Sequence, residues 1–129
     1  MFLSKDVSGR IVSVSYRYLG RPFDYETFNC VHFVRVVYFE VGINLPLLIR
    51  NGLPPIEFHL SNEEFALMPI GHIVFLKRKK GKLERFWTHV AIIAESKTLI
   101  HCTRNIGKGV VLTSLSDFME VYDLTPQKL

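Results

Sequence analysis

Three side chains in this chain of 129 residues have the types and the order that thiol chemistry requires. Cys30 supplies a thiol, and His89 and His101 follow it along the chain. A thiol becomes a strong nucleophile when an adjacent imidazole accepts its proton, and a further polar group can hold that imidazole in one tautomer. The sequence therefore predicts Cys30 as the nucleophile, His89 as the general base and His101 as the group that orients His89.

The surroundings of Cys30 predict that it opens a helix. Asn29 is a favourable N-cap, and apolar residues recur at steps of three and four from Phe33 to Val41, before a stop at Gly42. The unpaired N–H groups at a helix start would stabilise a thiolate, and the N–H of Cys30 could donate to an oxyanion. For Cys30 taken alone, the alternative is a buried cysteine that packs as a small hydrophobic residue.

The two histidines lie on neighbouring apolar runs that predict strands, with a turn near Ser96 between them. Side chains of an antiparallel pair share a face only when the register has the right parity. A connection of three residues, 95–97, would place His89 and His101 on one face, whereas a two-residue turn would place them on opposite faces. Each histidine taken singly could instead be a hydrogen-bonded residue of the core or surface.

The rest of the pattern predicts an α+β domain. A first helix of about ten residues ends before Gly20, and the helix at Cys30 follows it. Residues 43–70 hold four of the six prolines, which predicts a loop-rich excursion with a short helical piece at 62–68. An antiparallel sheet of about five strands follows. The predicted strands are residues 73–76, 86–93, 98–102, 110–113 and 121–124.

The composition predicts a single domain over residues 1–129, because 48% hydrophobic residues can form one core in a chain of this length. Sixteen Lys and Arg against twelve Asp and Glu give a net charge of +4, which favours anionic partners. The basic run 77–82 predicts a solvated hairpin tip. With neither a leader pattern nor a long apolar segment, we expect synthesis in the cytoplasm without a signal peptide, and no membrane insertion.

Five short blocks occur in an order that is typical of one enzyme family. They are Tyr-Leu-Gly-Arg-Pro-Phe at 18–23, Asn-Cys at 29–30, Gly-His-Ile-Val-Phe at 71–75, His-Val-Ala-Ile at 89–92 and Leu-Ile-His at 99–101. Over residues 8–125 the chain resembles the NlpC/P60 cysteine peptidases, papain-like enzymes that cut peptidoglycan stem peptides. The resemblance implies a papain-like fold with N-terminal helices packed on the sheet, the catalytic roles given above, and no metal or cofactor.

Several positions depart from the pattern of that family. Members commonly have Asp before the cysteine and Ser-Gly after it, whereas this chain has Asn29 before it and Val31 after it, and Phe23 stands where a tyrosine is usual. The resemblance implies that Asn29, Val31, Phe23 and Tyr18 contact the substrate. Because Asn29 lacks a charge that would pair with a free amine, cleavage between D-glutamate and the diamino acid is not assumed.

The compact domain also resembles the small amidase effectors that type VI secretion delivers between bacteria. This resemblance implies a peptidoglycan peptide as substrate, action in the periplasm of a target cell after secretion, and an immunity protein that blocks the cleft. We expect the protein to be a monomer. Phage and housekeeping wall peptidases share the same catalytic parts and are the alternative within this class.

Other classes of function remain open on the sequence alone. A non-catalytic peptidoglycan-binding or scaffold domain could keep the same fold. A zinc site could be built from Cys30, His89, His101 and Cys102, but the adjacent strand residues His101 and Cys102 point to opposite faces. The basic run lacks the interleaved aromatic residues of a nucleic-acid surface, so no nucleic-acid partner is expected. Thiol-dependent acyl transfer to a lipid is the chemically nearest alternative.

Overall fold

The computed structural model of the chain describes residues 4–45, 70–78, 89–104, 108–118 and 122–123. Within these residues the structure has three helices and five strands, and they confirm the predicted α+β class. The helices are α1 (Lys5–Arg17), α2 (Cys30–Glu40) and α4 (Leu115–Phe118). The strands are β1 (Ile73–Arg78), β2 (His89–Glu95), β3 (Thr98–Thr103), β4 (Gly109–Ser114) and β5 (Tyr122–Asp123).

The first helix is longer than the sequence pattern predicted. It begins after an N-cap residue, Ser4, that lies before the first apolar residues of the pattern. The Ser4 hydroxyl accepts the N–H of Val7 at 3.2 Å, so the helix begins at Lys5 and runs for 13 residues. Its apolar face includes Ile11 and Val14, which are buried. A glycine with a positive φ, Gly20, follows shortly after its end and turns the chain away.

Helix α2 begins at Cys30, as predicted, because residues 29 and 32 form a reciprocal cap. The Asn29 Oδ1 accepts the N–H groups of Val31 and His32 at 2.9 and 3.1 Å. In return, Nδ1 of His32 accepts the N–H of Asn29 at 3.1 Å. This is a capping box with a histidine in the position that Glu or Gln usually holds. The cap therefore fixes the backbone on both sides of the thiol.

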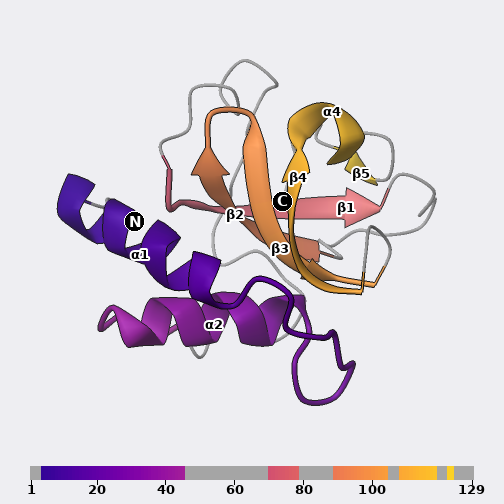
Figure 1. Cartoon of the computed structure of the whole chain (residues 1–129), viewed down its shortest axis with the longest axis horizontal. Helices are drawn as coiled ribbons and strands as arrows, with labels where there is room; N and C mark the ends of the chain where they lie inside the picture. Colours follow the sequence, from indigo (N-terminus) through magenta and orange to yellow (C-terminus); the bar gives the residue numbers. More distant parts are fainter. Residues whose placement is uncertain (1–3, 46–69, 79–88, 105–107, 119–121, 124–129) are drawn as a thin grey trace.

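The five strands form one antiparallel sheet in the order β4-β3-β2-β1-β5 (Figure 1). Strands β1 to β4 form a meander, and the two-residue β5 pairs with β1 at the other edge. Figure 1 shows α1 and α2 together on one side of this sheet. The short helix α4 was not predicted. The predicted helical piece at 62–68, the basic residues 79–82 and the start of the second strand at 86–88 lie outside the described residues.

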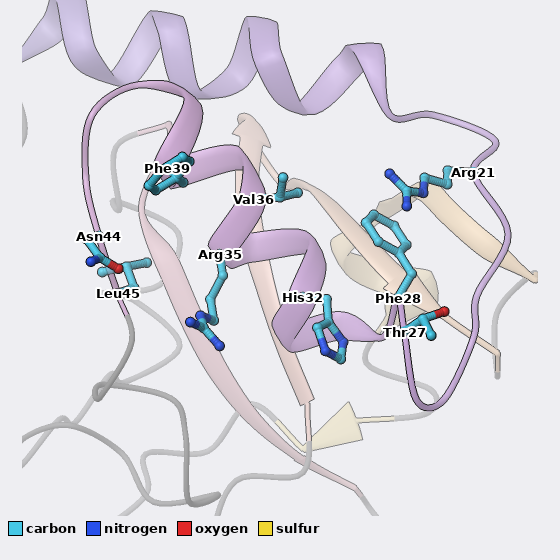
Figure 2. Close-up of a pocket in the computed structure, with 9 residues that line it drawn as sticks. All are labelled: Arg21, Thr27, Phe28, His32, Arg35, Val36, Phe39, Asn44 and Leu45. Atoms are coloured by element: carbon cyan, nitrogen blue, oxygen red, sulfur yellow. The ribbon is translucent and has the colours of Figure 1, made fainter.

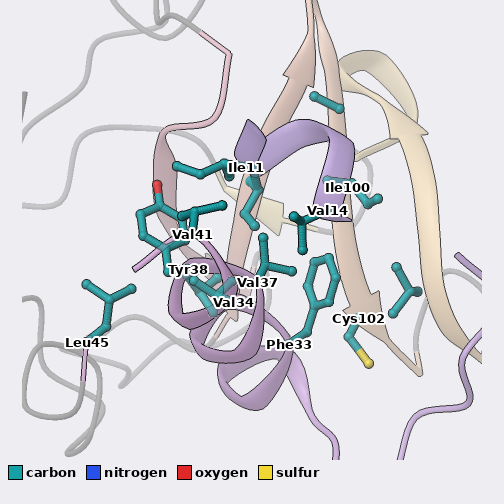
Figure 3. Close-up of a cluster of buried hydrophobic side chains, with 14 of the residues drawn as sticks. Ile11, Val14, Phe33, Val34, Val37, Tyr38, Val41, Leu45, Ile100 and Cys102 are labelled. Carbon is teal, nitrogen blue, oxygen red and sulfur yellow. The ribbon is translucent and has the colours of Figure 1, made fainter. Parts of the chain in front are cut away.

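The core lies between the two long helices and the sheet (Figure 3). Phe33, Val34, Val37 and Tyr38 of α2 are all fully buried and provide its centre. Tyr38 also donates its hydroxyl to the carbonyl oxygen of Gly71 at 2.5 Å, which connects α2 to the start of β1. Side chains of the sheet complete the cluster, namely Val90, Ile92, Ala94, Ile100, Cys102 and Val110. No helix in the described part of the chain is both long and apolar enough to span a bilayer.

Candidate active site

A β-bulge places the two histidines on one face of the sheet. Residue pairs Ile92–Ile100 and Ile93–Leu99 keep one register, but the next pair is Glu95–Thr98, so one extra residue lies in β2. The connection that follows has two residues. Of the two connections considered, the structure has the two-residue turn, but the bulge gives the parity that was expected only of the three-residue connection. His89 and His101 consequently lie on one face as diagonal neighbours.

The histidines and a threonine form a continuous line of polar atoms across three strands. Nε2 of His89 and Nδ1 of His101 lie 2.7 Å apart, which confirms that the two rings meet. Nε2 of His101 lies 2.8 Å from the hydroxyl oxygen of Thr113 on β4. All three side chains are buried. This geometry gives His101 a partner on each ring nitrogen, so the ring is held in a single orientation.

Thr113 was missed in the sequence analysis. Its strand was predicted, but threonine is common in strands for reasons of packing alone. The signal is in the register: Val111 pairs with His101, so Thr113, two residues further, lies on the same face as His101. Only a known pairing between β3 and β4 makes this signal visible.

The Cys30 thiol lies where β2 and β3 separate. The N–H of Ile93 donates to the His72 oxygen at 3.0 Å, so it points toward β1. Because N–H directions alternate along a strand, the N–H of Val90, three residues earlier, points toward β3. The pairing of β2 with β3 begins only at Ile92. In the space before this pair, the Val90 N–H donates to the Cys30 sulfur. The sulfur therefore lies beside the residue that follows His89.

The electrostatic surroundings of Cys30 favour a protonated thiol at rest. Burial raises the pKa of the thiol, while the backbone N–H groups of Val90, Val31 and Cys30 lower it to a smaller extent. The N–H groups at the helix start stabilise the thiolate, as expected, but desolvation outweighs them. A base must take the proton before this sulfur can act as a nucleophile.

Cys102 is the other free thiol, and its surroundings do not suit a nucleophile. It is fully buried, and it donates to the carbonyl oxygen of Phe28 at 3.5 Å. Burial first, and the nearby Cys30 thiol second, raise its pKa to about 12. Although Cys102 follows His101 in the chain, adjacent strand residues point to opposite faces, so the two do not form a catalytic pair. Among the described residues, no three His, Cys, Asp or Glu side chains could hold a metal ion.

The predicted substrate contacts are all engaged in structural roles. Besides its cap, Asn29 donates from Nδ2 to the carbonyl oxygen of Tyr25 at 3.0 Å. The Tyr18 hydroxyl donates to the carboxylate of Glu40. Phe23 and Val31 are half-buried and pack against the core. Contact of these four side chains with a substrate stays a prediction.

The segment before α2 is attached to β4. Gly20 donates its N–H to the Val110 oxygen, and the Val110 N–H donates to the Arg21 oxygen, each at 3.0 Å. The contact is so close that a Cβ on Gly109 would lie 2.2 Å from the Arg21 oxygen. Glycine is therefore required at 109, and it allows the segment that carries Phe23 to lie against the sheet.

A basic hollow of about 410 Å³ lies on the outward side of α2 (Figure 2). Its basic side chains are Arg21, His32 and Arg35, and the Arg21 guanidinium lies 3.8 Å from the centroid of the Phe28 ring. Because Nδ1 of His32 accepts the Asn29 N–H, a neutral His32 ring carries its hydrogen on Nε2. Apolar side chains complete the lining, namely Val36, Phe39 and Leu45. Guanidinium groups and an imidazole N–H suit a carboxylate ligand.

No protein-family model and no curated protein matches this chain. Solved structures do match it. An NlpC/P60 family protein from Bacillus cereus ATCC 10987 has a TM-score of 0.69 and 22% identity, over 94% of this chain and 39% of its own. A protein from Staphylococcus aureus subsp. aureus Mu50, described as similar to lipoprotein of the NLP/P60 family, has a TM-score of 0.65 and 19% identity, over 100% of this chain and 43% of its own.

The NlpC/p60 domain of the peptidoglycan hydrolase SagA matches over nearly its whole length. It has a TM-score of 0.60 and 23% identity, over 95% of this chain and 98% of that domain. The chain spans about two fifths of the other two proteins. At these identities the shared property is the fold, so the architecture of this chain is NlpC/P60-like. The partly buried Cys30 and the buried histidines His89 and His101 are side chains of the types that a cysteine peptidase uses.

Proposed function

We propose that this protein is a cysteine hydrolase that cuts an amide bond in peptidoglycan peptides. Two neighbouring observations carry the proposal. The imidazoles of His89 and His101 lie 2.7 Å apart, and Val90, the residue after His89, donates its N–H to the Cys30 sulfur. The paired imidazoles and the sulfur that accepts the N–H of the residue after His89 support the assignment of Cys30 as the thiol, His89 as the base and His101 as the orienting group. The similarity to structures named NlpC/P60, one of them a domain of a peptidoglycan hydrolase, supports the substrate class.

The proposed mechanism follows from which nitrogen of His89 is already hydrogen-bonded to His101. Nε2 of His89 is directed at His101, so the proton of the Cys30 thiol passes to Nδ1 of His89. The thiolate attacks the amide carbonyl, and the N–H of Cys30 donates to the oxyanion. His89 returns the proton to the leaving amine, which leaves a thioester on Cys30. His89 then deprotonates a water that hydrolyses the thioester and regenerates the thiol.

The charge of the protein supports an acidic peptide as substrate. Peptidoglycan stem peptides carry carboxylates, and the hollow beside α2 presents Arg21 and Arg35 near the helix whose first residue is Cys30. The net charge of +4 would also favour encounter with an anionic polymer. Which amide is cut depends on how a peptide lies between the hollow and the thiol.

An antibacterial effector that acts in the periplasm of a target cell, with an immunity protein as partner, is the more specific form of this proposal. Directing the chain to the periplasm of a test bacterium should then cause lysis, and Cys30→Ala should abolish the lysis. If the wild type caused no lysis there, but cut the cell wall as part of a phage particle or in the bacterium that produces it, a phage or housekeeping wall peptidase would be favoured.

The direct test is hydrolysis of purified sacculi under reducing conditions. We expect the wild type to release muropeptides that mass spectrometry identifies. Cys30→Ala should lower the rate by at least about a thousandfold, since the other thiol, Cys102, is fully buried. Cys102→Ala is the matched control and should keep the activity. Equal release by the wild type and Cys30→Ala, with both proteins folded, would contradict the mechanism.

A further inference from the structure

Thr113 lies at the far end of the line of polar atoms that begins at His89. Its hydroxyl oxygen is 2.8 Å from Nε2 of His101, and its side chain is 5% exposed. A hydroxyl can donate or accept, whereas each nitrogen of a neutral imidazole can do only one of these. The direction of the bond at Thr113 therefore determines the direction of every bond in the line.

The base-competent arrangement requires Thr113 to accept. Burial lowers the pKa of His101 to about 3, so this ring is neutral at physiological pH and carries one hydrogen. With that hydrogen on Nε2 and directed at Thr113, Nδ1 of His101 accepts the Nε2–H of His89. The lone pair of His89 is then on Nδ1, where it can take a proton.

The opposite arrangement blocks the base. If Thr113 donated to Nε2 of His101, the hydrogen of His101 would be on Nδ1 and directed at Nε2 of His89. Neutral His89 would then hold its own hydrogen on Nδ1, and it could not take the Cys30 proton there. A doubly protonated His89 also needs an acceptor at Nδ1 of His101, which only the first arrangement provides.

We propose that Thr113 is a positioning residue whose oxygen accepts the Nε2–H of His101 and thereby keeps His89 in the tautomer that can deprotonate Cys30. The inference rests on the function proposed above for Cys30 and His89. It adds a residue on a third strand, β4, that touches neither the thiol nor the base.

The first test measures alkylation of Cys30 by iodoacetamide as a function of pH, with peptide-resolved mass spectrometry to separate it from Cys102. Thr113→Val keeps the shape of the side chain but leaves a buried N–H of His101 without its acceptor. We expect the rate at neutral pH to fall about tenfold to a hundredfold, and the profile to move to higher pH. Thr113→Ser keeps the oxygen and should restore most of the rate.

An unchanged rate and profile in Thr113→Val would overturn the inference, and so would a Thr113→Ser protein as slow as Thr113→Val. The second test needs no variant: nitrogen-15 spectra of the histidines should show both His89 and His101 with hydrogen on Nε2. A wild-type His101 with hydrogen on Nδ1 would overturn the inference. Neither test uses peptidoglycan, so failure to hydrolyse sacculi would contradict the proposed function without deciding the role of Thr113.

Discussion

His101 is buried as a neutral ring, and this gives the protein a specific sensitivity to acid. Burial lowers its pKa from 6.5 in the unfolded chain to about 3 in the folded protein. Between these values the unfolded state binds one more proton than the folded state, so the free energy of unfolding falls as the pH falls. The loss begins near pH 6.5 and is complete near pH 3.

We therefore expect wild-type stability to fall with a slope of up to about 1.4 kcal/mol per pH unit from this group. His101→Asn keeps a polar side chain but removes the titration, so its stability should fall less steeply over the same range. Urea unfolding at a series of pH values from 7 to 4 measures both slopes. Parallel curves for the two proteins would show that His101 is not buried as a neutral ring.

Individual residues differ in how far the sequence reveals them. Cys30, His89 and His101 could be chosen because thiols and imidazoles are rare and their order along the chain is informative. Thr113 could not, because a hydroxyl in a strand is ordinary until its neighbours are known. The Val90 N–H could not either, because every residue but proline has one, and only the separation of β2 from β3 directs it to a sulfur.

At the scale of elements, the cap at the start of α2 both stabilises the helix and holds the backbone of Cys30. Asn29→Ala removes the acceptor of two N–H groups, so we expect a loss of about 1 kcal/mol in the free energy of unfolding. We also expect a lower rate of hydrolysis, because the thiol is carried by the first residue of the helix. Urea unfolding and the sacculus assay measure these two effects.

Asn29→Asp is the matched control, because aspartate accepts the same two bonds and is the residue usual in NlpC/P60 proteins. It should keep the stability that Asn29→Ala loses. If Asn29→Ala were as stable as the wild type, the cap would not determine where α2 begins.

The elements themselves were predicted well where a local signal exists. The N-cap at Asn29 and the apolar spacing after it locate α2, and apolar runs bounded by turn residues locate β3 and β4. The start of α1 was missed because the polar first turns of that helix carry no apolar period, although Ser4 caps them. The bulge in β2 was missed because Ala94 has no feature that distinguishes an extra residue from a paired one.

For the whole molecule, the long-range contact between residues 20–23 and β4 determines where the segment before Cys30 lies. Gly109→Ala would place a Cβ 2.2 Å from the Arg21 oxygen, at a φ of 158° that favours glycine. We expect a loss of about 1–3 kcal/mol in the free energy of unfolding, together with reduced hydrolysis as the segment moves.

Gly9→Ala is the matched control, because Gly9 is in α1 and a Cβ there would meet no atom within 4 Å. Alanine also has the higher helix propensity, so this variant should be at least as stable as the wild type. If Gly109→Ala unfolded at the same urea concentration as Gly9→Ala, the contact with Arg21 would be dispensable. The sequence alone could not show which of the two glycines tolerates a Cβ, because residues 21 and 109 are brought together only by the tertiary fold.

The bulge in the β2–β3 hairpin limits how the chain can vary in length. Hairpin tips usually tolerate insertions and deletions, because the added or lost residue is exposed to solvent. Here a single-residue insertion or deletion at the tip would turn one imidazole to the other side of the sheet, unless the bulge were lost or a second one gained at the same time. Natural variants of this hairpin should therefore change length only through such paired events, which makes an exposed turn as constrained as the buried residues that it serves.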